Sequence, residues 1–393
     1  MKFVHLSDLH IGKRLDGFSL IEDQEYILSE ILDMIREEAP DGVFIAGDVY
    51  DRPVPGTEAV RLFDRFITTL AALKTQVFII SGNHDSEDRL SFGSRLMELS
   101  GVHFSPAYNG ETEPYIFKDG DAETAVYMLP FLKPAEVRRH FPETEIASYT
   151  DAIAAAVSHM DIDESRVNLL LSHQFVTGAL RSESEEISVG GLDNVDASVY
   201  APFDYVALGH IHGPQEVKGR EGQILRYAGT PLKYSFSEEN HQKSVTVIEI
   251  GTRVSSGAPE KEKTISVRTI PLTAQHDMRT IRGTYEALTA RQNYVNTATE
   301  DYLQVILTDE EDVPDALNRL RVIYPNIMKL RYDNTRTRNN LITGEGSADP
   351  RETNPMDLFA DFYKEQNGKE LSEKETALMQ KLIERVFDEE VQS

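Results

Sequence analysis

Five short apolar runs recur along the first 210 residues of the chain, and each of them ends in polar side chains. A run of four or five apolar residues without alternation is typical of a strand that is covered on both faces. The runs are 3–6, 43–46, 77–80, 167–171 and 205–208, and they lead into "SDLH", "GD", "SGNHD", "SH" and "GHIH". The pattern therefore predicts buried strands whose ends expose residues that can bind metals or protons.

The segments between the first three runs carry apolar residues at helical spacing. Between the first and second runs these are Ile27, Leu28, Ile31, Leu32 and Ile35, and between the second and third they are Phe63, Phe66, Ile67 and Leu70. Alternation of strand and helix predicts a layered α/β core, in which ligands gather beyond the carboxyl ends of the strands. We therefore expect the five polar strand ends to meet at one site.

The chain becomes rich in strand-like segments from about residue 224. "QILRYAGTPLKYSF" and "KSVTVIEI" are predicted strands around a Gly-Thr-Pro turn, and residues 252–263 are a predicted solvated hairpin loop. These strands would complete a sheet that packs on the core. We place the end of this first domain, 1–270, after them.

The C-terminal third predicts a small α/β domain, a linker and a helical segment. In the small domain, 271–340, a helix at 316–323 lies between strands at 302–307 and 327–332. Residues 341–355 are rich in Gly, Ser and Pro without periodicity, which is typical of a flexible linker.

The last segment, 356–393, carries two apolar stripes at helical spacing, made of Leu358, Phe359, Phe362 and Tyr363, and of Leu378, Leu382, Ile383, Val386 and Phe387. A helical hairpin after a linker cannot bury both stripes alone, so we expect it to dock on another chain. Packing on its own catalytic domain is the alternative, which the length of the linker disfavours.

The amino-acid composition limits which metal ligands, cellular locations and substrates are possible. The chain has no cysteine, which leaves any metal to oxygen and imidazole ligands. It has no stretch of 18 apolar residues and no signal-peptide pattern, so we expect a cytoplasmic protein without a membrane span. The net charge of -26 disfavours an autonomous nucleic-acid binder, because such affinity comes mostly from Lys and Arg. It fits either simple solubility or a polyanionic substrate held by metals and a partner protein.

Seven side chains at the strand ends form a candidate ligand set for metal ions: Asp8, His10, Asp48, Asn83, His173, His210 and His212. So many oxygen and imidazole ligands suit two ions with open water positions better than one closed structural site. Two ions about 3.5 to 4 Å apart can polarise a phosphoryl group and generate hydroxide, so phosphoester hydrolysis fits best. The other histidines, His5, His103, His140, His159, His241 and His276, are interpreted as packed or solvated side chains.

The motifs "SDLHIG", "GDVYD", "SGNHDS", "LSHQ" and "LGHIH" resemble those of the calcineurin-like metallophosphoesterases over about residues 1–250. "YAGTPLKYSFSE" and "NPMDLFADFYKEQNG" narrow the resemblance to the bacterial exonuclease subunits of this family. The resemblance implies a two-manganese DNA phosphodiesterase, with Mg²⁺ as the other possible metal. It also implies a long coiled-coil ATPase as partner, docked by the C-terminal helices, in a heterotetramer with two copies of each subunit. The implied work is exonuclease and endonuclease cleavage of DNA duplex ends, hairpins and single strands in repair and recombination.

The resemblance also implies a role for each site residue. The first ion would be held by Asp8, His10, Asp48 and His212, and the second by Asp48, Asn83, His173 and His210. His84 would face the scissile phosphate and protonate or stabilise the leaving oxygen. Its neighbour Asp85 could hydrogen-bond the imidazole and keep it oriented or charged.

One departure from the family pattern concerns Asp51. The archaeal and eukaryotic relatives carry a histidine three residues after the bridging aspartate, where this chain has Asp51. A role of that histidine in positioning DNA is therefore in doubt here. Lys13 and Arg14 are candidate phosphate contacts, although exposed basic residues are usually only solvated.

Two other functions stay open from the sequence. The same ligands would serve a metallophosphoesterase that acts on a nucleotide, a cyclic nucleotide or a phosphoprotein. The small domain, linker and helical segment disfavour this alternative, because a small-molecule phosphatase has no evident need for them. A binding module with a vestigial metal site is the other alternative, and the complete ligand set with His84 disfavours it.

Overall fold

A computed structural model describes residues 1–338 apart from 121, 186–192 and 255–260, and beyond them 356, 359–360, 362–364, 369–372, 374–376, 378–380 and 382. The described chain forms two compact units, the first ending at Met278 and the second beginning at Arg279. Among the described residues, no helix is long and apolar enough to cross a membrane. The predicted domain boundaries, at 270/271 and at the two ends of the linker, stay predictions.

The first unit contains two six-stranded sheets. In the first sheet the order is β16-β15-β1-β4-β5-β6, with the parallel strands β1, β4, β5 and β6 next to the antiparallel pair β15 and β16. These strands are β1 Lys2–Leu6, β4 Gly42–Ala46, β5 Gln76–Ile80, β6 Val102–Phe104, β15 Ser244–Val254 and β16 Lys261–Pro271.

The second sheet has the order β13-β14-β12-β9-β8-β7, parallel in its centre and antiparallel at both edges. Its strands are β7 Tyr115–Asp119, β8 Ala122–Leu129, β9 Val167–His173, β12 Tyr205–Gly209, β13 Gln215–Val217 and β14 Ile224–Tyr227. All five apolar runs are strands, as predicted, and they divide between the two sheets: β1, β4 and β5 in one, β9 and β12 in the other.

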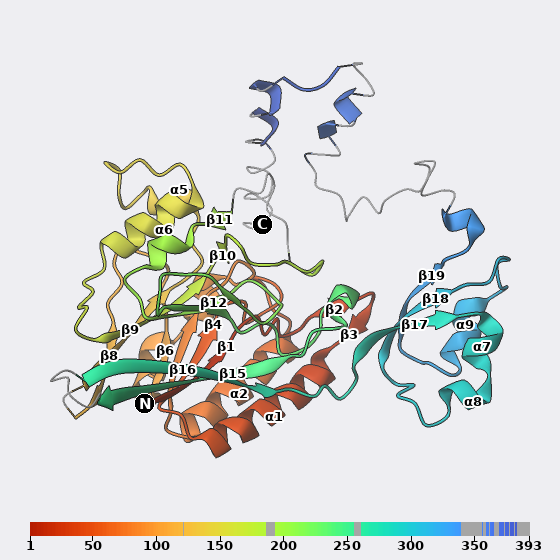
Figure 1. Ribbon diagram of the computed structural model, residues 1–393, viewed down its shortest axis with the longest axis horizontal. Helices are drawn as coiled ribbons and strands as arrows, with labels where there is room; N and C mark the ends of the chain where they lie inside the picture. The colour runs from red at the N-terminus through yellow and green to blue at the C-terminus, as the bar shows by residue number, and fades with distance from the viewer. Residues whose placement is uncertain are drawn as a thin grey trace. The chain divides into compact units, whose positions relative to one another are not determined.

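The two sheets pack face to face, with helices on the outside (Figure 1). Phe3, Phe44 and Phe78 of the first sheet share one core with Leu169 and Leu171 of the second. The alternate residues of the second sheet, such as Leu170, face α6 (Tyr149–Ser158). On the other side α1 (Ile21–Glu38) packs on α2 (Thr57–Ala72), which contacts β5. The predicted layered α/β core is confirmed.

Short elements complete the first unit. They are the helices α3 Glu87–Leu90, α4 Ser94–Met97 and α5 Pro134–Val137, the 3₁₀ turns η1 Glu98–Ser100, η2 Ala197–Tyr200 and η3 Phe236–Glu238, and the strand pairs β2 Arg14–Leu15 with β3 Phe18–Ser19 and β10 Phe175–Val176 with β11 Asn194–Val195.

The predicted hairpin loop at 252–263 is too long. The antiparallel ladder of β15 and β16 continues through Thr252↔Lys263 to Val254↔Lys261. Charged residues and a Pro-Gly-Ser composition suggested a loop, but paired strands tolerate charged residues on a solvated face, and the pattern near a hairpin end cannot show where pairing stops.

The second unit begins with a three-stranded sheet in the order β17-β18-β19. The predicted strands are confirmed as β18 Tyr302–Leu307 and β19 Ile327–Tyr332, with α9 Ala316–Arg321 between them. β17 Met278–Gly283 and the short helices α7 Tyr285–Thr289 and α8 Arg291–Tyr294 were not predicted. Its core contains Leu303, Val305, Leu307, Leu320 and Ile327.

The C-terminal segment is helical at the described residues 356, 359–360, 362–364, 374–376, 378–380 and 382. The hydroxyl of Tyr363 donates to Oε1 of Glu375 at 2.9 Å. Three stripe residues have large exposed fractions, 58% for Phe362, 59% for Leu378 and 44% for Leu382. Leu358, Ile383, Val386 and Phe387 lie outside the described residues.

Candidate metal centre

The five strand ends meet where the two sheets adjoin. Asp8 and His10 follow β1, Asp48 follows β4, Asn83 follows β5, His173 ends β9, and His210 and His212 follow β12. All of them except Asn83 are buried. The sequence-predicted ligand set is therefore brought to one place in space.

Close backbone packing sets this geometry. The amide of Asp8 donates to the carbonyl of Gly47 at 3.0 Å, and the amide of His10 donates to that of Asp48 at 2.9 Å. Asp8, His10, Asp48 and His210 all have positive φ, between 44° and 96°, a region that non-glycine residues rarely adopt. Such backbone costs about 1 to 3 kcal/mol per residue and is found mostly at functional sites.

Gly82 shows why glycine precedes Asn83. A Cβ atom at this position would lie 2.1 Å from Oδ1 of Asp48 and 2.5 Å from its amide nitrogen. Glycine at this position therefore lets the β5 loop approach Asp48 closely.

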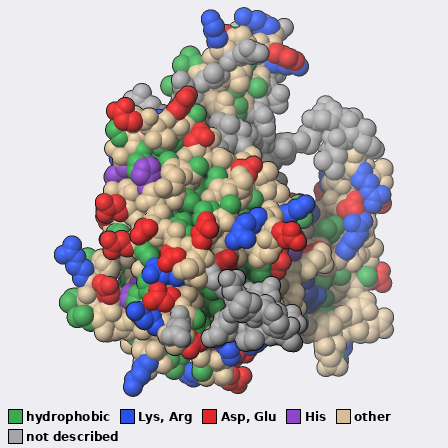
Figure 2. Space-filling view, turned by 60° about the vertical axis from the view of Figure 1, so that its left-hand side comes forward, with side chains coloured by type: hydrophobic (Ala, Val, Ile, Leu, Met, Phe, Trp, Pro, Cys, Tyr) green, Lys and Arg blue, Asp and Glu red, His purple; other side chains and the backbone are tan. Residues whose placement is uncertain are grey.

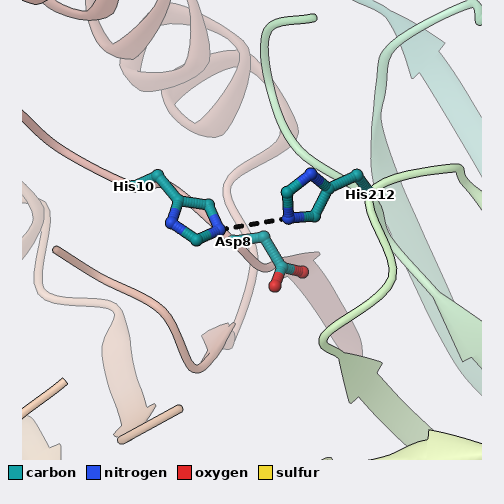
Figure 3. A group of neighbouring side chains, drawn as sticks. All are labelled: Asp8, His10 and His212. Atoms are coloured by element: carbon teal, nitrogen blue, oxygen red, sulfur yellow. Dashed lines mark hydrogen bonds between the residues drawn. The ribbon is translucent and has the colours of Figure 1, made fainter. Parts of the chain in front are cut away.

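The first ligand cluster consists of Asp8, His10 and His212, whose ligand atoms lie within 4.8 Å of one another. The Nε2 atoms of His10 and His212 face each other at 3.1 Å, with the Asp8 carboxylate beside them (Figure 3). Oδ2 of Asp48 lies 3.6 Å from His10 Nε2. These are the four residues expected around the first ion.

The second cluster surrounds Asn83. Its Oδ1 lies 3.1 Å from Nε2 of His173 and 3.0 Å from Nδ1 of His210. Oδ2 of Asp48 lies 3.3 Å from the same His173 atom. Asp48 therefore reaches both clusters, as a residue that bridges two ions must.

Three buried polar atoms of the site accept or donate no hydrogen bond within the described part of the chain: Asp8 Oδ2, His10 Nδ1 and His210 Nε2. Leaving such an atom unpaired costs about 1 to 3 kcal/mol. The nitrogens of His10 and His210 in this group are not the ones that face the clusters, whereas Asp8 Oδ2 belongs to a carboxylate of the first cluster, where a cation would supply its partner. Together with the Asp and His composition, this orphaned carboxylate oxygen fits a dinuclear site for divalent metals.

The charges of the site are strongly coupled. Burial raises the pKa of Asp8 to about 6. Burial acts in the same direction on Asp48, but the neighbouring His173 and His84 outweigh it and hold the pKa of Asp48 well below its usual range. Burial lowers the pKa of His173, yet Asp48 more than compensates and raises it to about 9. In this pair the positive charge beside the ionised Asp48 is that of His173, and a bound cation would take its place.

His84 lies beside the first cluster. Its amide donates to Oδ1 of Asp48 at 2.9 Å, its Nδ1 lies 3.2 Å from the carbonyl oxygen of Asp51, and its ring meets that of His10 edge-on at 4.8 Å. His10, Asp48 and His84 also form a group with ligand atoms within 4.8 Å. Position alone therefore leaves His84 either as a proton donor or as a further ligand.

Asp85 has other partners than those we predicted. Its Oδ2 accepts from the amides of Val49 and Gly82, and its Oδ1 accepts from the amide of Tyr50, each at 3.0 Å. Because the carboxylate holds three backbone amides, it braces the β4 and β5 loops together. His84 lies on the β5 loop that Asp85 braces.

Asp51 and Lys13 form an ion pair next to His10. Nζ of Lys13 lies 2.7 Å from Oδ1 of Asp51, and the same oxygen lies 3.7 Å from His10 Nδ1. Arg14, the other candidate phosphate contact, donates to the carbonyl of Gly17 at 2.8 Å. The sequence marked these residues separately but gave no sign of the pairing of Lys13 with Asp51.

The sequence also missed residues that support the ligands from behind. Gln24 of α1 donates to the carbonyl of His10 at 2.7 Å, and the hydroxyl of Tyr234 donates to that of Leu9 at 2.7 Å. Glu238 and Ser184 lie behind His212. Tyr234 and Glu238 belong to the "YAGTPLKYSFSE" motif, which was the one signal that could have directed attention to them.

The six histidines interpreted from the sequence as packed or solvated belong to none of these ligand groups among the described residues. Nδ1 of His5 pairs with the hydroxyl of Tyr205, His159 stacks on Phe141, and His276 pairs with Asp23. These contacts agree with packed or paired roles.

Known proteins with similar sequences define the family to which this chain belongs. The model of the family described as calcineurin-like phosphoesterase matches residues 1–214, more than half of the chain. The chain therefore belongs to the calcineurin-like phosphoesterases. A second model, described as type 5 capsule protein repressor C-terminal domain, matches residues 274–367.

Within this family the resemblance to SbcD proteins extends along nearly the whole chain. The SbcD subunit of nuclease SbcCD from Staphylococcus epidermidis is 30% identical over 99% of this chain and 100% of its own length. The SbcD subunit of nuclease SbcCD from Staphylococcus saprophyticus is 31% identical over 99% of both chains. The narrower resemblance that the sequence motifs indicated is confirmed.

The solved structures that resemble this chain do so only distantly. A dimetal phosphatase from Danio rerio is 12% identical, with a TM-score of 0.41, over 63% of this chain and 92% of its own. TT1561 of Thermus thermophilus is 9% identical, with a TM-score of 0.35, over 62% of this chain and 92% of its own.

Proposed function

We propose that this chain is a metal-dependent DNA nuclease that hydrolyses phosphodiester bonds with two divalent metal ions. The observation that carries the proposal is the position of Asp48, whose Oδ2 lies 3.3 Å from His173 and 3.6 Å from His10 in the two clusters. The relatives that are similar over the full length carry the name of a nuclease subunit, which supports a nucleic acid as the substrate, and the motif resemblance implies DNA.

Each group of the site has a task in this mechanism. Asp8, His10, Asp48 and His212 would hold one ion, and Asp48, Asn83, His173 and His210 the other. When bound, the ions would polarise the scissile phosphate and lower the pKa of an attacking water. His84 would protonate or stabilise the leaving oxygen, and Asp85 would keep the loop that carries it in place. Among divalent ions we propose Mn²⁺, with Mg²⁺ as the alternative.

The net charge of the chain supports the proposal that it acts on DNA together with a partner protein. Acidic and basic side chains are interspersed on the face shown in Figure 2, and the whole chain carries a net charge of -26. Long DNA is bound mainly through Lys and Arg, so a partner would supply much of that surface. We propose an SbcC-type coiled-coil ATPase, bound through the C-terminal helices in an assembly with two copies of each subunit, acting in the cytoplasm on DNA ends and hairpins.

The substrate class is tested with the purified full-length chain and Mn²⁺. Linear duplex DNA, hairpin DNA, mononucleotides, a cyclic nucleotide and a phosphopeptide are compared at equal concentration, with and without the ATPase and ATP. The proposal predicts that DNA has the highest kcat/KM and that ATPase and ATP increase cutting of long duplex. Preference for a nucleotide or a phosphopeptide would establish the alternative phosphoesterase function. Tight DNA binding without cleavage of any substrate would indicate a binding module.

A further inference from the structure

His212 presents its two ring nitrogens to different surroundings. Nε2 faces His10 at 3.1 Å in the first cluster (Figure 3). Nδ1 points to the other side, 2.7 Å from the hydroxyl of Ser184 and 3.7 Å from Oε1 of Glu238. The ring is thus held between the candidate metal position and a polar group that the mechanism above does not use.

Glu238 is the centre of that polar group. Its side chain is fully buried, and its Oε1 accepts a hydrogen bond from the hydroxyl of Ser184. Its Oε2 pairs with the ammonium of Lys243, which is itself 5% exposed. A carboxylate buried this deeply requires a charged partner, and Lys243 provides one.

Lys243 also ties the group to the backbone that carries His212. Its ammonium has three protons, and they reach Glu238, the carbonyl of His212 at 2.8 Å and the hydroxyl of Thr230 at 2.7 Å. The amide of His212 donates to Oε1 of Glu185 at 2.7 Å. The backbone of His212 is therefore fixed at its amide and its carbonyl, and its ring at Nδ1.

Hydrogen-bond polarity decides which nitrogen of His212 carries the proton. The Ser184 hydroxyl also lies 2.7 Å from the hydroxyl of Ser182, which has a proton of its own to donate. The carboxylate paired with Lys243 only accepts, so the single proton of Ser184 goes to Glu238. The Ser184 oxygen must then accept from the Nδ1–H of His212. In a neutral imidazole this places the free electron pair on Nε2, the atom that faces His10 and Asp8.

We propose that Glu238, acting through Ser184 and neutralised by Lys243, is a positioning residue that fixes the ring orientation and the tautomer of the metal ligand His212. The proposal rests on His212 being a ligand in the proposed function. Carboxylates that act on a ligating histidine in this way typically change metal affinity by about 10- to 100-fold when they are removed. The motif "YSFSE" thereby has a chemical task in the centre, although Glu238 itself touches neither metal nor substrate.

The test measures Mn²⁺ affinity in the full-length chain, by titration with detection of free Mn²⁺, for Ser184→Ala, Ser184→Thr and Glu238→Gln. Ser184→Ala leaves the pair of Glu238 and Lys243 in place and removes the hydroxyl that contacts the ring, Glu238 and Ser182. We expect one of the two Mn²⁺ sites to lose about 10- to 100-fold in affinity in Ser184→Ala and Glu238→Gln, while the other keeps its affinity. Ser184→Thr keeps a hydroxyl and should bind close to wild type. Ser158→Ala, whose hydroxyl caps a carbonyl of α6, is the matched control.

Thermal unfolding of the metal-free chains separates a positioning role from a structural one. We expect Ser184→Ala to unfold within a few degrees of wild type without metal. Wild-type Mn²⁺ affinity in Ser184→Ala would overturn the proposal. A loss of Mn²⁺ affinity that is found only in variants whose metal-free form unfolds at a lower temperature would also overturn it. If Glu238→Gln does not fold, the Mn²⁺ affinity of Ser184→Ala alone tests the proposal. Wild-type chain that binds two Mn²⁺ but cleaves no DNA would contradict the proposed function and leave this proposal standing.

Discussion

Oδ2 of Asp48 lies 3.3 Å from Nε2 of His173, although Asp48 follows a strand of the first sheet and His173 ends a strand of the second. The candidate centre therefore exists only while the two sheets keep their mutual position. The shared apolar core of Phe3, Phe44, Leu169 and Leu171 fixes that position. Burial of the sheet faces and assembly of the ligands are thus one event.

The variant His84→Gln should keep both Mn²⁺ ions and lose most of its hydrolysis. Asp8, His10, Asp48 and His212 form a ligand set without His84, while general acid catalysis contributes about 10² to 10⁴ in rate. The loss should therefore appear in kcat. Metal content by elemental analysis and steady-state rates on linear DNA, whose leaving oxygen is poor without protonation, check this. A variant that has lost one ion per chain would make His84 a ligand instead.

The variant Asp85→Ala should lower the free energy of unfolding by about 2 to 4 kcal/mol, because three backbone amides lose a charged acceptor. It should also slow hydrolysis, since the same loop carries Asn83 and His84. Urea unfolding of the metal-free chain measures the first effect. Asp119→Ala, an exposed aspartate at the end of β7, is the control. Equal midpoints for Asp85→Ala and Asp119→Ala would show that the bracing is unimportant.

Glu87 gives a pH-dependent prediction for stability. Burial, with the charges of Glu136 and Asp88, raises the pKa of its carboxyl from 4.5 to about 7. Because the folded chain holds this proton more tightly than the unfolded chain, protonation of Glu87 stabilises the fold. The stabilisation is complete below the ordinary pKa of 4.5 and is lost as the pH rises through about 7. The glutamine in Glu87→Gln cannot ionise. Between pH 5 and pH 8 the free energy of unfolding of this variant should therefore rise by about 1 kcal/mol relative to that of wild type, after allowance for solvent screening. Parallel unfolding curves at the two pH values would contradict this.

Removal of the chain after about residue 345 should leave hydrolysis of a small diester intact and weaken assembly with the ATPase. The candidate centre lies wholly within the first unit, which ends at Met278. Phe362, Leu378 and Leu382 are exposed, and burying each such side chain at a partner contributes about 1.5 to 3 kcal/mol. A pull-down with the ATPase and a parallel diesterase assay measure both properties.

The double variant Phe362→Asp with Leu382→Asp tests the same surface in a chain of full length. It should weaken capture of the ATPase as the truncation does, while the exposed substitution Leu180→Asp should not. Unchanged capture by the truncated chain would show that the C-terminal helices are not the docking element.

The fold could be predicted where the pattern is local. Runs such as 77–80 are apolar throughout because β5 is covered on both faces, and the four predicted apolar positions of α2 are all buried. The division of the five strands between two sheets could not be read, because a buried strand has the same pattern in either sheet. The end of the β15–β16 pairing depends on contacts across the hairpin, which spacing along the chain does not encode.

The candidate ligands could be predicted because each is set by the strand that it follows. The supporting groups could not, because they come from distant parts of the sequence. Ser184 and Glu238 are 54 residues apart, and both act on His212 through contacts that only the folded chain creates. The contacts of Asp85 were predicted wrongly because closeness in sequence does not show where a side chain points. Asp85 is next to His84 in sequence, yet its carboxylate turns to the backbone of Val49 and Tyr50.

The most direct measurement counts Mn²⁺ ions and DNA cleavage together in wild type, Asp48→Asn and the surface control Asp119→Asn. The account predicts two Mn²⁺ per wild-type chain, with cleavage of linear DNA that stops on chelation. Asp48→Asn should bind fewer ions and lose at least about 10²-fold in rate, because metal ions contribute several kcal/mol to the transition state. Asp119→Asn should match wild type in both. Full cleavage by Asp48→Asn, or by wild type in excess chelator, would contradict the two-metal nuclease.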